Sequence, residues 1–214
     1  MLEQATRLIL IRHGETAWNR ATRIQGHTDI PLSPLGLAQA ESLARALSDE
    51  PLAALYASDL SRARQTAEAL ARHHGLDVRL DRGLRERAFG RFEGLDWAQI
   101  AQSHPEEAAR WRRREPDFAV GGGESLRDFS VRCLAAVRRA AAAHPGQGIA
   151  IVAHGGVLDC LYRAATGIAL DAPRSWQLGN ATINRLLATP DGFTLIGWND
   201  DQHLAGLSAD DVSA

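Results

Sequence analysis

The 214-residue sequence predicts an α/β fold of three layers, with a mostly parallel central sheet, helices on both faces and an antiparallel C-terminal edge. Short apolar segments alternate with longer segments of helical periodicity, which is the pattern of a parallel sheet covered on both faces. Near the C-terminus two apolar segments are joined by the turn Thr189–Gly192, whose residue types favour an antiparallel hairpin. No repeat or linker interrupts this order, so we expect a single domain over residues 1–214.

The first half of the chain offers three strands and two helices. The expected elements are, in order, a strand at Leu8–Ile11, a helix at Pro34–Leu47, a strand at Ala53–Ala57, a helix at Ser61–His74 and a weak strand at Val78–Leu80. The first helix has Ser33 as its N-cap and Pro34 in its first position, and both residue types are favoured at helix starts. Gly75 closes the second helix, because glycine tolerates the left-handed conformation that ends many helices.

The second half adds four helices, one strand and the hairpin. The expected elements are helices at Trp97–Ser103, Pro105–Arg114 and Ser125–Ala143, a strand at Ile149–Ala153, a helix at Val157–Thr166 and hairpin strands at Thr182–Leu187 and Phe193–Trp198. A loop with three consecutive glycines, 121–123, precedes the long alanine-rich helix, and Pro145-Gly146 ends that helix. The hairpin gives the otherwise parallel sheet its antiparallel edge.

Two histidines follow directly on predicted strands. His13 comes at the end of the first strand and His154 at the end of Ile149–Ala153, and glycine follows each of them. Open α/β sheets bind ligands at the carboxyl ends of their strands. Arg12 adds a planar cation suited to phosphate, and glycine lets backbone amides approach a ligand. An isolated His-Gly pair is more often structural, but its repetition beside Arg12 favours a shared anion pocket with a histidine nucleophile or electrophile.

The basic residues exclude several functions. All 24 are arginine, so lysine Schiff-base chemistry and a Walker-type phosphate loop are excluded. A formal net charge of −2 leaves no broad basic face for nucleic acid. The longest apolar run is far too short to span a membrane, and no secretory signal is visible. We therefore expect no nucleic-acid or membrane partner and a cytoplasmic location.

The cysteines and the remaining histidines do not suggest a metal or redox site. Cys133 and Cys160 lie in helical patterns, and we expect them to be reduced core residues. Cys133 and Arg139 have the spacing of a cysteine phosphatase, but no glycine lies between them to form an amide cradle. His73 and His74 are adjacent on a helix and point to different sides. No metal and no organic cofactor is expected.

Three further charged residues are candidates for chemistry. Arg62 lies in the first turn of the helix Ser61–His74, and helix N-termini attract anions. Glu86 and Glu93 lie in a loop with two glycines, and either carboxyl group could be a general acid. Taken alone, Arg62 is typical of a surface arginine and the two glutamates of solvated loop residues.

Together these segments resemble the histidine phosphatase superfamily, which includes the cofactor-dependent phosphoglycerate mutases. The resembling segments, over about residues 7–200, are Arg12-His13-Gly14-Glu15-Thr16 with Trp18-Asn19; Gln25-Gly26 and Asp29-Ile30-Pro31-Leu32-Ser33 with Gly36; Ser58-x-Leu60-x-Arg62-Ala63-x-x-Thr66-Ala67; Leu84-x-Glu86 with Gly90 and Glu93-Gly94; Gly123-Glu124-Ser125; and Ala153-His154-Gly155-Gly156. Each segment is weak by itself, but their combination in this order is highly specific.

The resemblance implies a role for each matching residue. His13 would be the nucleophile that becomes a phosphohistidine, and Glu86, rather than Glu93, would protonate the leaving oxygen. The implied phosphoryl ligands are Arg12, Arg62 and His154. The implied supporting contacts are Asn19, Gln25, Gly26 and Gly155. Such phosphoryl transfer rests on positioning and charge stabilisation, so no cofactor is required.

The leading interpretation is a metal-independent phosphohydrolase that cleaves phosphomonoesters of small metabolites, as a monomer or homodimer. The alternative within the family is a phosphoglycerate mutase. Mutases that resemble this chain have a tyrosine where Phe89 stands and a lysine a few residues beyond Gly94, where this chain has Asp96. Trp111-Arg112-Arg113 points the other way, because it resembles the arginine pair with which mutases grip phosphoglycerate. The sequence leaves the role of Arg112 and Arg113 open.

The alternative from another class is a non-catalytic phosphate-binding protein on the same fold. A binder needs no acid beside a nucleophile. The presence of His13, Glu86 and His154 together therefore favours an enzyme, a phosphoric monoester hydrolase.

Overall fold

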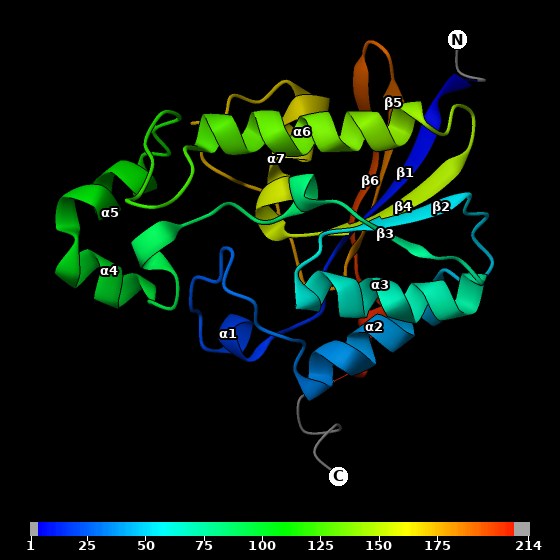
Figure 1. Ribbon diagram of the computed structural model, residues 1–214, viewed down its shortest axis with the longest axis horizontal. Helices are drawn as coiled ribbons and strands as arrows, with labels where there is room; N and C mark the ends of the chain where they lie inside the picture. Colours follow the sequence, from blue (N-terminus) through cyan, green and yellow to red (C-terminus); the bar gives the residue numbers. More distant parts are fainter. Residues whose placement is uncertain (1–3, 208–214) are drawn as a thin grey trace.

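The computed structural model describes residues 4–207, and its middle layer is a six-stranded mixed sheet (Figure 1). The strands follow the order β3-β2-β4-β1-β5-β6. Their bounds are β1 (Thr6–Arg12), β2 (Ala54–Ala57), β3 (Val78–Leu80), β4 (Gly148–Ala153), β5 (Ile183–Thr189) and β6 (Gly192–Asp200). The first four strands are mutually parallel, and β5 is antiparallel to both β1 and β6. The predicted fold class and its antiparallel C-terminal edge are confirmed.

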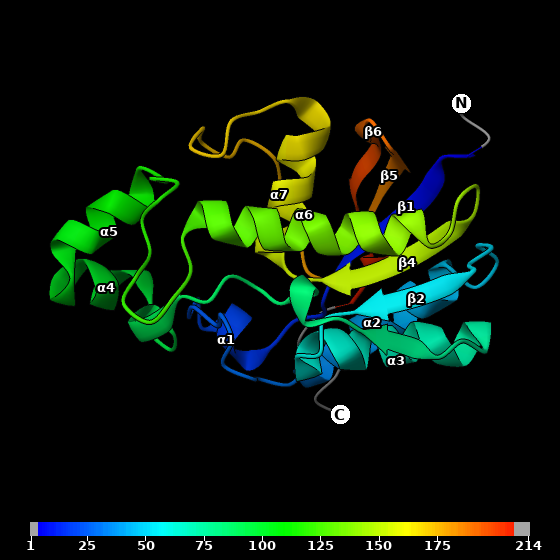
Figure 2. The ribbon, with the colours of Figure 1, turned by 45° about the horizontal axis from the view of Figure 1, so that its top comes forward.

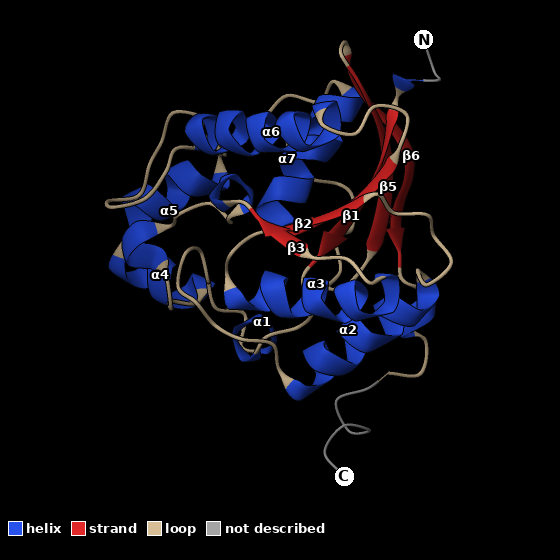
Figure 3. Cartoon of the chain, turned by 45° about the vertical axis from the view of Figure 1, so that its right-hand side comes forward, coloured by secondary structure: helices blue, strands red, loops and turns tan. Residues whose placement is uncertain are grey.

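Helices cover both faces of the sheet (Figure 3). One face carries α2 (Pro34–Ala46) and α3 (Ser61–His74), and the other carries α6 (Leu126–Ala142) and α7 (Gly155–Thr166). The helices α1 (Ala17–Arg20), α4 (Trp97–Ser103) and α5 (Pro105–Arg112) lie beyond the carboxyl ends of the parallel strands (Figure 2). Between residues 4 and 207 we find no helix with the length and apolar character needed to cross a bilayer.

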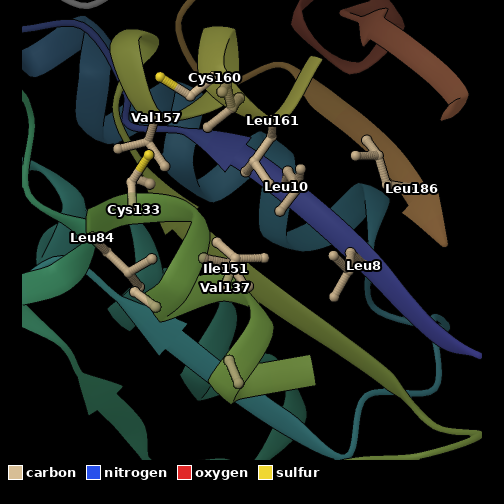
Figure 4. Packing of buried hydrophobic residues seen from close by; sticks show 14 of the residues in the cluster. Leu8, Leu10, Leu84, Cys133, Val137, Ile151, Val157, Cys160, Leu161 and Leu186 are labelled. Carbon is tan, nitrogen blue, oxygen red and sulfur yellow. The ribbon is translucent and has the colours of Figure 1, made fainter. Parts of the chain in front are cut away.

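The core is divided by the sheet into two clusters, because successive side chains of a strand point to opposite faces. Leu8 and Leu10 of β1 pack with α6 and α7, in the cluster shown in Figure 4. Ile9 and Ile11 pack with α2 and α3 on the other face. Cys133 and Cys160 lie in the first cluster as buried free thiols, as the sequence predicts.

The predicted helix signals act as expected. The Ser33 side chain accepts a hydrogen bond from the Gly36 amide at 3.0 Å, with Pro34 in the first position of α2. Gly75 ends α3 in the left-handed conformation, with φ of 62°. Some helix bounds differ from the prediction: α7 begins at Gly155 rather than at about Val157, and α5 ends at Arg112 rather than at Arg114. The four-residue helix α1 has no counterpart in the prediction. Four residues are too few for apolar periodicity to reveal a helix.

A third, smaller cluster holds together the segment that contains α4 and α5. Its buried members are Phe92, Ile100, Ala108, Phe118 and Val120. This segment lies over the end of the sheet where β4 and β2 finish (Figure 2). It therefore supplies one wall for any site at the carboxyl edge of the sheet.

Candidate active site

Two buried histidines meet at the carboxyl ends of the central strands. β1 and β4 are paired in register, with Arg12 opposite Ala153, so the next residue of each strand is a histidine. The rings of His13 and His154 have their centroids 5.2 Å apart and their planes inclined at 60°. The exposed fraction is 3% for His13 and 0% for His154. The structure thus brings together the two histidines for which the sequence predicts a shared pocket.

The hydrogen bonds of the two rings fix opposite tautomers. Nδ1 of His13 lies 2.7 Å from the Gly14 carbonyl oxygen, which can only accept, so Nδ1 carries the proton and Nε2 has a free lone pair. Nδ1 of His154 accepts from Nε of Arg62 at 3.3 Å, so the proton of neutral His154 is on Nε2. That Nε2 is buried and has no partner within residues 4–207. His13 therefore offers a nucleophilic nitrogen, and His154 offers a hydrogen-bond donor.

Arg62 is a fully buried cation beside this pair. Its exposed fraction is 0%, and it lies one position inside the N-terminus of α3. Its guanidinium donates to the carbonyl oxygens of Gly26 at 2.8 Å and Thr28 at 3.0 Å, and its Nε donates to His154. These three bonds hold the guanidinium plane in one orientation, so Arg62 is a preorganised cation and not the surface residue that its sequence context alone suggests.

Arg12 is the second cation of the site. Its Nη1 donates to the Leu178 carbonyl oxygen at 2.6 Å. Its Nε is buried and has no partner among the described residues. The guanidinium lies against Gly155 at the start of α7, where a Cβ would stand 3.5 Å from Arg12 Nε. Because a buried donor without a partner is costly, this nitrogen is suited to an incoming anion.

Burial lowers the pKa of all four groups, which favours their neutral forms. It lowers the pKa of Arg12 and of Arg62 to about 10, and the negative charge of Glu86 opposes the shift in both. Burial, followed by the charge of Arg62, holds the pKa of His13 and of His154 well below the usual histidine range. Both imidazoles are therefore neutral near pH 7, and the two arginines leave an excess of positive charge that an anion would neutralise.

The histidine shifts predict acid sensitivity of the fold. An unfolded histidine takes up a proton near pH 6.5, whereas these two in the folded protein do so only at much lower pH. Below about pH 6.5 the unfolded state binds more protons, so the free energy of unfolding falls by about 1.4 kcal/mol per pH unit for each histidine. We expect urea unfolding at pH 7.0 and 5.5 to show this loss.

A pair of variants separates the histidine effect from the titration of carboxylates. His154→Gln retains an acceptor for Arg62 and should reduce the loss of unfolding free energy between pH 7.0 and 5.5. His73→Gln, at an exposed position paired with Glu41, should leave that loss unchanged. An identical pH dependence in His154→Gln and the parent chain would contradict the assignment.

Glu86 is the carboxyl group that faces the pocket. Its oxygens accept from the amide of Arg87 at 2.8 Å and from the amide of Gly156 at 3.0 Å. A Cβ on Gly156 would collide with Glu86 Oε1, so a side chain there would displace the carboxyl group. The α7 N-terminus thereby positions Glu86, and the side chain lines a cavity that also includes Gly156, two residues after His154.

Glu93 has a different, structural role. Its carboxylate accepts from the amides of His27 at 3.0 Å, Thr28 at 2.9 Å and Phe89 at 3.0 Å, and from the Thr28 hydroxyl at 2.7 Å. With these four bonds its oxygens fasten the loop around residues 26–28 to the loop around residue 89. Of the two glutamates that the sequence offers as an acid, the structure leaves Glu86 facing the cavity.

The four predicted supporting residues have unequal structural roles. Gly26 has φ of 54°, a conformation that favours glycine, and its carbonyl oxygen accepts from Arg62. Gln25 Oε1 is buried without a partner in residues 4–207. Asn19 Oδ1 accepts from the Thr16 amide at 3.0 Å and so caps α1. Gly155 lets Arg12 approach the α7 N-terminus.

A cavity of about 650 Å³ opens beside Glu86. Its aromatic lining consists of Phe89, Trp97 and Trp111, in and beside the α4–α5 segment, and Phe129 of α6. Arg112 lines the cavity and lies over the Trp97 ring, with its Cζ 4.4 Å from the ring centroid. Its neighbour Arg113 does not line it and pairs with Glu115 at 2.7 Å. The adjacent arginines therefore do not act as a pair in this structure.

Sequence reasoning missed residues that hold the site together. Thr66 Oγ1 accepts from the Gly14 amide at 3.0 Å, and Asn180 Nδ2 donates to the His13 carbonyl oxygen at 2.9 Å. Arg174, which lines the cavity, was also missed. Thr66 stands in one of the resembling segments and could have been found there. Asn180 and Arg174 lie in the irregular segment between α7 and β5, where no periodicity or capping signal indicates a position.

The histidine phosphatase superfamily (branch 1) matches residues 8–201 of this chain. Phosphoglycerate mutase-like protein 4 of Arabidopsis thaliana is 37% identical over 201 residues, which are 92% of this chain and 86% of that protein. The metal-independent phosphoserine phosphatase of the same plant is 34% identical, with coverage of 95% and 85%. The native structure of mycobacterial glucosyl-3-phosphoglycerate phosphatase superposes with a TM-score of 0.83 at 33% identity, with coverage of 92% of this chain and 100% of that chain.

Proposed function

The chain belongs to branch 1 of the histidine phosphatase superfamily and is a phosphoric monoester hydrolase, and we propose that it cleaves phosphomonoesters of small metabolites through a phosphohistidine on His13. The observation that carries the proposal is the opposite tautomers of the histidine pair. Nε2 of His13 has a lone pair, and Nε2 of His154 has a proton and no partner among the described residues. A phosphoryl group between them would meet a nucleophile on one side and a donor on the other.

In the first step, Nε2 of His13 attacks phosphorus in line with the leaving oxygen. The P–N bond forms as the P–O bond breaks, and Glu86, in its acid form, gives its proton to the leaving oxygen. The guanidinium groups of Arg12 and Arg62 neutralise charge on the remaining phosphoryl oxygens, and the neutral His154 donates a hydrogen bond to one of them from Nε2. The Gly14 carbonyl stabilises the imidazolium character that His13 gains, because it accepts the Nδ1 proton.

In the second step, water replaces the alcohol in the cavity. Glu86 is now a carboxylate and takes a proton from the water as its oxygen attacks phosphorus, so the P–N bond breaks and orthophosphate leaves. His13 returns to its neutral tautomer and Glu86 to its acid form. The charge stabilisation in both steps comes from side chains of the chain itself, which is the reason to propose a metal-independent reaction.

Mutase activity is the second candidate, and Arg112 in the cavity wall favours it. One observation supports hydrolysis instead. Arg113 pairs with Glu115, so the second arginine of the resembling pair is missing from the cavity.

The test is product analysis with chelator present. The chain is incubated with 4-nitrophenyl phosphate and a panel of phosphorylated metabolites, and orthophosphate release is measured. In parallel, 3-phosphoglycerate with bisphosphoglycerate primer is assayed for interconversion to 2-phosphoglycerate. We expect orthophosphate release that persists in the chelator. Rapid interconversion with negligible orthophosphate would establish the mutase, and no turnover of any ester would favour a phosphate-binding protein.

A further inference from the structure

We propose that Arg132 is a positioning residue for the reaction, because its guanidinium holds the stretch of backbone that carries Glu86. This inference rests on the proposed function, in which Glu86 protonates the leaving oxygen. Arg132 lies on α6 and is not one of the residues that line the cavity. It would therefore act on the reaction through Glu86 and not by contact with the substrate.

The segment that carries Glu86 has no regular structure of its own. Glu86 lies between two short 3₁₀ turns, Arg82–Leu84 and Gly90–Phe92, and residues 85–89 belong to no helix or strand. The carbonyl groups of such a loop need hydrogen-bond donors from elsewhere in the molecule. The place of the Glu86 carboxyl group therefore depends on the side chains that bind this loop.

Arg132 binds several carbonyl oxygens of the loop at once. Its Nη1 donates to the carbonyl oxygens of Gly83 at 2.9 Å and Arg85 at 3.1 Å, and that of Arg82 lies 3.4 Å away. Its Nη2 donates to the carbonyl oxygen of Glu86 itself at 3.1 Å. A guanidinium is planar and has five N–H donors, so these bonds hold the loop in a fixed relation to α6.

Glu124 keeps the Arg132 guanidinium in this orientation. Its carboxylate accepts from Nε of Arg132 at 2.8 Å and from Nη2 at 2.7 Å, which is a bidentate ion pair. The same carboxylate accepts from the Ala88 amide at 2.9 Å, and the Glu124 amide donates to the Ala88 carbonyl oxygen at 2.9 Å. The loop is thus bound on both sides of Glu86, by Arg132 up to Glu86 and by Glu124 after it.

This support decides whether Glu86 can reach the leaving oxygen. The amides of Arg87 and Gly156 orient the carboxyl group, but the Gly156 amide belongs to α7 and can do so only while the backbone of Glu86 stays in place. Without Arg132 that backbone keeps only the bond from His27 Nε2 to its carbonyl oxygen, at 2.8 Å. A displacement of about 1 Å in a reacting group can cost about a hundredfold in rate.

The experiment measures how Arg132→Ala depends on the leaving group, with 4-nitrophenyl, phenyl and ethyl phosphates. We expect kcat/KM for ethyl phosphate to fall by about ten- to a hundredfold, and for 4-nitrophenyl phosphate by less than about threefold. Orthophosphate, measured as a competitive inhibitor, should bind to the variant and the parent chain with the same affinity. A merely structural defect would slow all three esters together.

Two further variants isolate the cause. Arg139→Ala is the matched control, because Arg139 lies on the same helix and bonds to the Asp81 carboxylate at 3.2 Å, at the start of the same loop, rather than to its carbonyl oxygens. It should leave the ratio of kcat/KM values unchanged. Arg132→Lys retains the positive charge but not the planar fork, so it too should slow ethyl phosphate selectively. A folded Arg132→Lys chain with the parent's ratio would overturn the inference, even if Arg132→Ala failed to fold.

The double variant Arg132→Ala with Glu86→Gln tests whether the effect passes through Glu86. Once the acid is lost, removal of Arg132 should cost little further activity on phenyl phosphate, whereas independent effects would multiply. If Glu86→Gln is selective for poor leaving groups but Arg132→Ala slows all esters equally or none, this inference is overturned and the proposed function stands. Absence of selectivity in Glu86→Gln itself would overturn the acid assignment, and the role of Arg132 with it.

Discussion

Replacing His13 by asparagine is expected to lower kcat toward 4-nitrophenyl phosphate by about four orders of magnitude or more, as loss of a catalytic nucleophile does. The asparagine amide can still donate to the Gly14 carbonyl, as Nδ1 of His13 does at 2.7 Å, but it has no nitrogen lone pair where Nε2 stood. His154, Arg62 and Arg12 remain in place. Binding of orthophosphate should therefore persist while turnover is lost.

Rapid-quench experiments with radiolabelled substrate complete this prediction. The parent chain should form an acid-labile, alkali-stable phosphoryl adduct, which is the chemical signature of a phosphorylated nitrogen, and the His13→Asn variant should form none. His73→Asn, at an exposed position on α3, is the matched control and should retain the adduct. Turnover of more than a few per cent in a folded His13→Asn chain would refute the phosphohistidine step.

The strands and helices that could be predicted are those whose apolar pattern follows from which of their faces are buried. β4, and β1 from Leu8 to Ile11, are apolar because both of their faces are covered by helices, and the helix signals at Ser33 and Gly75 act locally. The helix α1 depends on a local capping box between Thr16 and Asn19 and is too short for apolar periodicity to reveal. The helix α7 begins at Gly155, where the lack of side chains on Gly155 and Gly156 leaves room for Arg12 and Glu86. These last contacts are tertiary, and periodicity cannot reveal them.

The candidate site likewise contains residues that could be predicted from the sequence and residues that could not. That His13 and His154 would meet follows from two strands ending in histidine, since parallel neighbours finish at one edge. The choice of Glu86 over Glu93 rested on resemblance alone, because both stand in one loop. The structure supplies a physical reason for this choice, because the Glu93 carboxylate binds backbone amides more than sixty residues away in the chain. Arg174 lies in an irregular segment with no pattern, and only the folded chain shows it at the cavity.

Glu86→Gln is the second variant with a large expected effect, and its size should depend on the leaving group. An alkoxide is a poor leaving group and needs a proton as the P–O bond breaks, whereas 4-nitrophenolate leaves without one. General acid catalysis contributes about 10²- to 10⁴-fold. We therefore expect kcat/KM for alkyl phosphates to fall by about that factor, and kcat/KM for 4-nitrophenyl phosphate to fall by less than about tenfold. A series of aryl phosphates of graded phenol acidity measures this dependence directly.

The geometry makes this variant a sharper test than removal of the side chain. Glutamine keeps the length of Glu86, and its carbonyl oxygen can accept from one of the two amides, of Arg87 or Gly156, that the carboxylate now binds. The loss should therefore fall on proton transfer more than on the shape of the cavity. Glu93→Gln is the matched control, since it weakens the loop contacts at His27 and Thr28 without touching the acid. It should slow alkyl and aryl esters by the same factor. If Glu86→Gln did the same, its carboxyl group would be holding the site together rather than protonating the leaving oxygen.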